Sequence, residues 1–177
     1  MAPLVDAFGR WPHTSIELRT RMDKPIDNLQ PWELSRFEWD QLANITKYER
    51  AGAVRVGDAC PVYNCHGLTF GNRRTSVSDD PNLIALILDD DGFTSVLEDS
   101  VRTGDIILYY DAAGSIEHSG IVLSKGPDPL DRPWIWSKWG KGYAMTHYVA
   151  VCPFVASHVR YYRLTKWKPE EVWKPNS

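Results

Sequence analysis

Cys65 and His118 are the two residues of this sequence whose types best suit nucleophilic chemistry. Cys65 lies in the stretch PVYNCHGLTFGNRR, residues 61 to 74, between an asparagine and a histidine. A turn over 61–64 followed by a helix would place this thiol at a helix start, where unpaired N–H groups favour the thiolate. His118 opens a β-type run, where an imidazole can take a thiol proton. Either residue alone is commonly a packing residue, but together they predict a nucleophile and its base.

A metal site is the main chemical alternative at the cysteines. Cys60, Cys65 and His66 form a C-x₄-C-H spacing, which lacks a clean second pair of ligands, although Cys152 and His158 could contribute. We therefore expect no metal and no cofactor.

The composition is that of a soluble globular protein with a single domain. The chain has 177 residues, 43% of them hydrophobic, and a net charge of −3 with a pI near 5.9. This charge gives no electrostatic case for binding nucleic acid or an anionic membrane. An odd count of three cysteines argues against a disulfide framework. Without a signal peptide or a membrane span, we expect cytoplasmic synthesis, with signal-independent secretion left open.

Two further helices are predicted before residue 100, besides the one that would begin at Cys65. Apolar residues at helical spacing over 31–50 indicate the first. The second runs from about 80 to 90, because Asp80 and its neighbours offer a cap, Pro81 suits the first turn and Gly92 suits the stop.

Strands dominate the rest of the chain. Two β-type runs, 105–110 and 116–123, flank a short turn and predict a hairpin. Runs at 133–139 and 158–164 predict a third and a fourth strand. Helices followed by an antiparallel meander indicate an α+β domain with the helices on one face of the sheet.

Three segments of the chain resemble the NlpC-like and CHAP-like superfamily of papain-fold cysteine peptidases and amidases. N-C-H-G-L-T at 64–69 resembles the D-C-S-G-[FL]-[VT] nucleophile motif of that family. GDII at 104–107 resembles its strand before the hairpin, and HSGIV at 118–122 resembles its strand that carries the general base. The resemblance covers residues 61 to about 139, and His66 departs from it by replacing a small serine.

This resemblance implies a papain-like (NlpC-type) core at 61–165, with N-terminal helices packed on a small antiparallel sheet. Residues 1–60 would be an N-terminal extension and 166–177 a C-terminal tail. Cys65 would attack an amide carbonyl and form a thioester, with His118 as proton acceptor and donor. The substrate would be a peptide or a peptidoglycan fragment. The small size of the chain would fit an effector that is delivered to another cell. The sequence does not identify an immunity or regulatory protein.

The residue that orients His118 is expected on the next strand. Ser137 is the best positional match, and His147 is an alternative. A third interpretation stays open, in which residues 137–139 are only the end of a strand with a solvated lysine and have no catalytic role. The residues expected to contact substrate are Asn64, His66, Trp136 and Trp139.

Two other functions use the same residues. An inactive homologue would bind a peptide or glycan through its tryptophan cluster at 134–139, leaving the cysteine without a role. An acyltransferase or transglutaminase would keep the Cys65–His118 pair and resolve the thioester with another acceptor.

Overall fold

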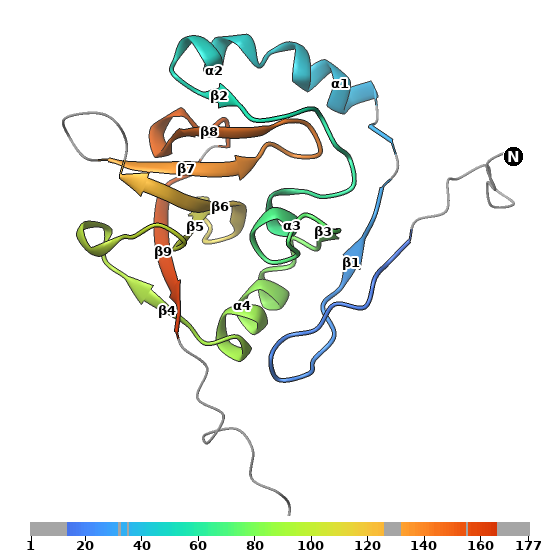
Figure 1. The fold of residues 1–177 in the computed structure, drawn as a ribbon, viewed down its shortest axis with the longest axis vertical. Coiled ribbons are helices and arrows are strands. Elements are labelled where there is room, and N and C mark those ends of the chain that lie inside the picture. The colour runs from blue at the N-terminus through green and yellow to red at the C-terminus, as the bar shows by residue number, and fades with distance from the viewer. Residues whose placement is uncertain (1–13, 32, 35, 126–131, 155, 166–177) are drawn as a thin grey trace, which may run out of the picture.

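The protein is organised around one seven-stranded antiparallel sheet (Figure 1). The computed structural model describes residues 14–31, 33–34, 36–125, 132–154 and 156–165, so the predicted tail at 166–177 lies outside the described residues. The order of the strands is β2-β8-β7-β6-β5-β9-β4. They are β2 (Val54–Arg55), β4 (Phe93–Val96), β5 (Ile106–Tyr110), β6 (Ile116–Lys125), β7 (Pro133–Lys138), β8 (Ala144–Tyr148) and β9 (His158–Leu164). The α+β class is confirmed.

The centre of the sheet is the predicted hairpin of β5 and β6. Its turn closes because Asp111 Oδ1 accepts hydrogen bonds from the backbone N–H groups of Ala113, at 2.9 Å, and Ser115, at 2.8 Å. β7 and β8 extend this hairpin as a meander, and β9 then returns to pair with the free side of β5. The strand at 158–164 is therefore confirmed, but it does not continue the meander.

The described helices are short. α4 (Pro81–Asp90) is the helix predicted from its cap, and Asp80 Oδ1 accepts from the backbone N–H of Asn82 at 2.9 Å. The single helix predicted over 31–50 is instead two helices, α1 (Arg36–Ala43) and α2 (Thr46–Arg50). α3 (Cys65–Thr69) follows, with 3₁₀ turns η1 (Glu98–Ser100) and η2 (Val149–Val151). No helix in the described part of the chain is long and apolar enough to cross a membrane.

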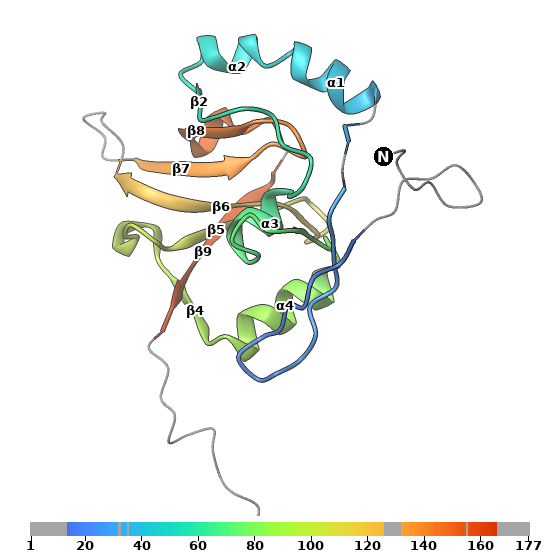
Figure 2. The same cartoon turned by 45° about the vertical axis from the view of Figure 1, so that its right-hand side comes forward.

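Successive residues of the central strands pack into different cores, because side chains alternate between the two faces of a sheet. Leu108 and Tyr110 face α4, where they pack with Ile84 and Ile87. Figures 1 and 2 show α3 and α4 together on this side of the sheet.

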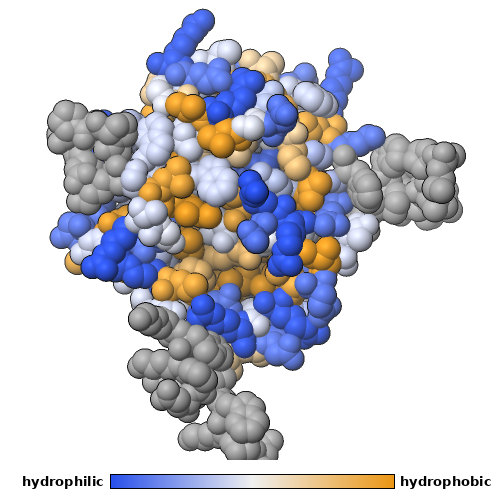
Figure 3. All heavy atoms as spheres, in the orientation of Figure 1, coloured by the Kyte–Doolittle hydropathy of each residue, from blue (hydrophilic) through white to orange (hydrophobic). Residues whose placement is uncertain are grey.

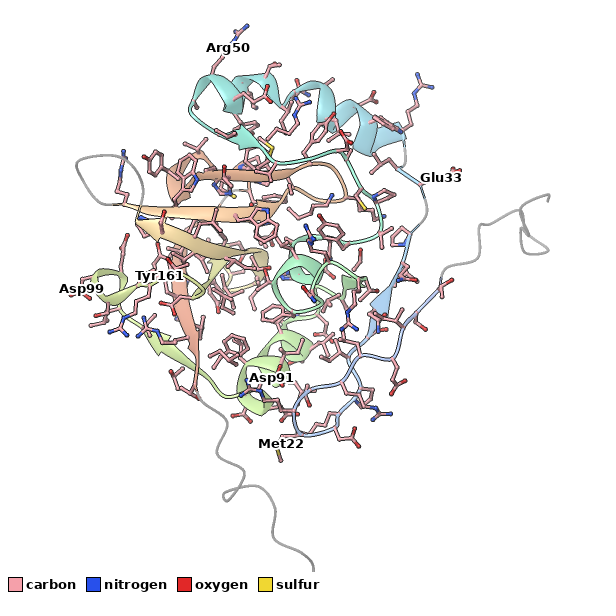
Figure 4. The ribbon with its side chains drawn as sticks, viewed as in Figure 1. Met22, Glu33, Arg50, Asp91, Asp99 and Tyr161 are labelled. Carbon is pink, nitrogen blue, oxygen red and sulfur yellow. The ribbon has the colours of Figure 1, made fainter. Side chains whose placement is uncertain are left out.

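The opposite face is filled by Tyr109, its neighbours on the central strands, and residues at and after η2. Figure 4 labels Tyr161, a β9 residue of this second core. α2 packs on the same face at the β8 end, where Tyr48 meets the Trp139 ring edge-on at 5.1 Å. Helices therefore cover both faces, and the expectation of a single helical face is wrong.

The segment before α1 holds the α4 side together. β1 (Asn28–Leu29) pairs with β3 (Ser76–Val77), the next element after α3. Nearby, Thr20 Oγ1 donates to Asp90 Oδ2 at 2.7 Å, and the Arg21 N–H donates to Asp91 Oδ1 at 2.6 Å. Figure 4 shows Met22 and Asp91 close together at this end of the molecule.

Candidate active site

The start of α3 is set by the side chain of Asn64. Its Oδ1 accepts hydrogen bonds from the backbone N–H groups of Gly67, at 2.8 Å, and Val77, at 3.1 Å, while its Nδ2 donates to the Val77 carbonyl at 2.8 Å. The amide thus caps the helix and ties it to β3. We expected Asn64 to contact substrate, but its polar atoms are taken up by the fold.

Gly67 allows α3 to lie directly on the chain before β3. A Cβ atom at Gly67 would lie 1.9 Å from the carbonyl oxygen of Thr75, which no side chain can tolerate. The glycine of the motif at 64–69 is therefore required by packing.

Cys65, the first residue of α3, lies beside the open part of β6. The pairing between β6 and β7 ends at Gly120 and Ser137, so residues 116–119 have β5 as their paired strand. α3 packs against this part of the sheet. Cys65 is 7% exposed and His118 is fully buried, and their charges influence each other.

His66 turns to a different part of β6. Its Nδ1 lies 2.9 Å from Ser119 Oγ, which lies 2.9 Å from Thr69 Oγ1, and Thr69 Oγ1 donates to the Cys65 carbonyl at 3.0 Å. The His66 ring is buried and stacks near Phe70. The Nδ1 atom of His66, which was expected to contact substrate, is thus used in an internal hydrogen-bond network. The His66 ring also lowers the pKa of Cys65.

The His118 ring contacts two aromatic rings. Phe154 stacks on it in parallel, with centroids 4.2 Å apart, and Tyr109 lies tilted at 5.3 Å. Neither ring nitrogen makes a hydrogen bond of ordinary geometry to any described residue. The thiols of Cys65 and Cys152 both interact with the ring.

The electrostatics favour an ion pair between Cys65 and His118. Burial by itself would raise the pKa of the Cys65 thiol, but His66 and His118 outweigh it and bring that pKa well below its ordinary value. Burial would likewise lower the pKa of His118, but Cys152 and Cys65 outweigh it and raise that pKa to about 10. The arrangement therefore stabilises thiolate next to imidazolium.

Ser137 does not reach His118. Its Oγ lies 2.7 Å from His147 Nε2 and accepts a hydrogen bond from Trp139 Nε1 at 3.0 Å. His147 Nδ1 donates to the Tyr148 carbonyl at 2.9 Å, which leaves Nε2 as the acceptor for the Ser137 hydroxyl. Burial lowers the pKa of His147 to about 4, so this ring is neutral. The expected role of Ser137 in orienting His118 has no contact to support it.

His147 and Cys152 are the groups that approach His118 instead. One ligand-type atom from each of the three residues lies within 4.8 Å of the other two. His147 was an alternative third residue, whereas Cys152 was expected only as a minor contributor to a metal site. No motif marks Cys152, because it follows η2 and is brought to His118 by the path of the loop.

The two tryptophans expected at a substrate site differ in position. Trp139 is 8% exposed and belongs to the core with Met145, so its ring is packed away from solvent, and its contact to substrate stays a prediction. Trp136 is half-buried on the α3 side, and the Arg73 guanidinium lies 5.7 Å from its ring centroid. Figure 3 shows apolar and weakly polar side chains gathered on this face. Trp136 stays a candidate for contact with a ligand.

Comparison of the chain with family models, with curated proteins and with solved structures finds no match in any of the three.

Proposed function

We propose that this protein is a cysteine hydrolase that cleaves an amide bond, with Cys65 as nucleophile and His118 as general base and acid. The observation that carries the proposal is the meeting of a thiol at the first residue of α3 with a buried imidazole on β6. These are the two residues that the motif resemblance selects. The same resemblance supports a papain-like relationship for the α3–β5–β6 unit.

The proposed reaction follows from these two groups. The Cys65 thiolate forms a bond to the amide carbonyl carbon, and the C–N bond then breaks as His118 gives its proton to the leaving amine. Water next attacks the thioester, loses a proton to His118 and releases the acid and the thiolate. The Cys65 backbone N–H, which has no partner within α3, is the candidate donor to the oxyanion.

The described state of the site is closed. Because Cys65 is 7% exposed and Phe154 covers one face of the His118 ring, a substrate carbonyl reaches the thiol only after side chains move. Trp136 and Arg73, on the α3 side, would then offer an aromatic ring and a positive charge to a peptide. We favour a peptide substrate, and peptidoglycan stem peptides are the class that the resemblance supports.

The first test is covalent trapping at each cysteine. The full chain, reduced and freed of metal by a chelator, is treated with iodoacetamide, and alkylation of each cysteine is timed by peptide mass spectrometry. We expect Cys65 to react faster than Cys60 below pH 7, and this advantage to shrink in a His118→Phe variant, in which His66 still lowers the pKa of Cys65. Cys60→Ser is the matched control and should leave Cys65 unchanged.

A second assay separates hydrolysis from binding and from acyl transfer. Peptidoglycan fragments and synthetic peptides are incubated with the wild type and with Cys65→Ala, and products are identified by mass. New free amines and acids that depend on Cys65 support hydrolysis. Transfer of the acyl group to an added amine supports the transferase alternative, and unmodified ligand bound equally by both chains would refute the enzymatic proposal.

A further inference from the structure

A second group of reactive side chains adjoins the proposed pair. Cys152, His147 and His118 come from the loop after η2, from β8 and from β6. Their sulfur and nitrogen atoms lie within 4.8 Å of one another, and both histidines are fully buried. The proposed hydrolysis uses His118 but assigns no role to His147 or Cys152.

His118 is the member whose nitrogens most need a partner. Both ring nitrogens are buried and make no hydrogen bond of ordinary geometry to a described residue, although the thiols of Cys65 and Cys152 interact with the ring. The hydroxyl of Tyr109, which interacts with Cys152, is also buried without a hydrogen-bond partner. Buried polar atoms are normally partnered, so this concentration of unpartnered atoms points to a ligand.

His147 is oriented as metal-binding histidines are. Its Nδ1 donates to the Tyr148 carbonyl, which leaves the lone pair on Nε2. That lone pair now accepts from Ser137, so an incoming ion would have to displace this hydroxyl. Ser137 would keep its hydrogen bond from Trp139.

We propose that Cys152, His147 and His118 form a binding site for a divalent transition-metal ion of the zinc type. One thiolate and two imidazoles suit zinc better than magnesium or calcium, which prefer oxygen ligands. In a tetrahedral zinc site the ligand atoms lie roughly 3.3 to 3.8 Å apart. The three groups would therefore need to close by at most about 1.5 Å. Binding would release the proton of the Cys152 thiol and the extra proton of the His118 imidazolium, and it would leave a fourth position for water.

The site would regulate the proposed enzyme. A metal ion on His118 removes the base from Cys65, so zinc would act as a reversible inhibitor. This consequence rests on the proposed function, whereas metal binding itself does not.

The test uses Co²⁺ as a spectroscopic probe on the reduced, chelator-treated full chain. We expect one Co²⁺ per chain, with a thiolate-to-cobalt charge-transfer band that Zn²⁺ abolishes by displacement. The band should be lost in Cys152→Ser and kept in Cys65→Ser and Cys60→Ser. His147→Gln should weaken binding by more than the ten- to hundredfold that loss of an outer-shell partner alone costs.

Two results would overturn the site. One is the absence of stoichiometric binding in the wild type. The other is a band that survives in Cys152→Ser and vanishes in Cys65→Ser, which would place the ion on the nucleophile.

A measurement on the wild type alone guards against a variant that fails to fold. Cys152 is partly exposed, so iodoacetamide can reach it. Zn²⁺ should slow alkylation of Cys152 at least about tenfold while leaving Cys60 unchanged, and equal rates with and without Zn²⁺ would contradict the site. Failure of hydrolysis in the peptide assays would leave these binding results untouched, so the two proposals fail separately.

Discussion

His66 and His118 are both buried beside Cys65, yet the fold treats them differently. His66 Nδ1 meets Ser119 and, through it, Thr69, in a network that joins α3 to β6. His118, the residue before Ser119, contacts the rings of Phe154 and Tyr109. It makes no hydrogen bond of ordinary geometry at either nitrogen, although the thiols of Cys65 and Cys152 interact with it. His66 therefore has a hydrogen-bond partner on β6, Ser119, whereas the neighbouring β6 residue His118 has no such partner for its nitrogens.

The difference separates stability from chemistry. A buried polar group with a partner contributes to the fold, whereas one without a partner costs free energy and persists where function requires it. The same substitution at the two histidines should therefore have different effects.

The largest effect is expected from His118→Phe. Phenylalanine keeps the stacking on Phe154 and removes the two unpartnered nitrogens, so the fold should be retained or stabilised. Loss of the general base should lower the rate of peptide cleavage about 10²- to 10⁴-fold. The rate is measured with a peptide that the wild type cleaves, and the melting temperature is measured in parallel. A variant with lower stability and an unchanged rate would reverse our assignment of His118.

Gly67→Ala tests the α3 side by packing alone. Its Cβ would lie 1.9 Å from the Thr75 carbonyl oxygen, so α3 must move away from the β3 segment. We expect a loss of about 3 kcal/mol in the free energy of unfolding. Urea denaturation followed by circular dichroism measures this loss, and an unchanged midpoint would show that α3 is not held this tightly.

Asp105 is a buried charged group that has all its partners. Arg163 Nε and Nη2 donate to its two carboxylate oxygens at 2.8 and 2.7 Å, and the Arg102 N–H donates at 2.8 Å. Burial alone would raise the pKa of Asp105, but these hydrogen bonds hold it below its ordinary value. Asp105→Asn should cost about 2 kcal/mol at neutral pH.

The pH dependence of unfolding provides the control for Asp105. Because the pKa of Asp105 is lower in the folded state, its contribution is fully present above its unfolded pKa of about 3.9 and is lost as the pH falls through the folded value. The wild type should therefore lose more stability than Asp105→Asn on acidification below about pH 4. Parallel curves for the two chains would show that this carboxylate adds no pH-dependent stability.

His66→Phe should have the smallest effect of the four. It removes the partner of Ser119 but leaves the Ser119–Thr69 hydrogen bond, so the expected loss is about 1 kcal/mol. Cleavage should fall far less than in His118→Phe. A larger loss of activity at His66 than at His118 would transfer the role of base to His66, whose charge also lowers the pKa of Cys65.

Local signals in the sequence were sufficient for several elements. The cap at Asp80 and Pro81 predicted α4, and the turn after Tyr110 predicted the β5–β6 hairpin. The start of a helix at Cys65 was also predicted, because a turn over 61–64 precedes it. These features depend on residues within a few positions of each other, so a single sequence contains them.

The contacts of the site depended on the tertiary structure. β9 pairs with β5, and the loop after η2 brings Cys152 and Phe154 to His118. Ser137 on β7 forms a hydrogen bond with His147 on β8. Its position in the sequence had instead favoured Ser137 as the residue that orients His118.

The sequence by itself determined the cap of α4, the central strands and the pair of residues suited to thiol chemistry. Only the tertiary structure decided which buried groups have partners. Alternation assigns a side chain to a face of its strand, but strand order, register and loop paths decide which side chain lies opposite. Cys152 and His147 are far from Cys65 along the chain, and they join its site because the β sheet and the loop after η2 place them around His118.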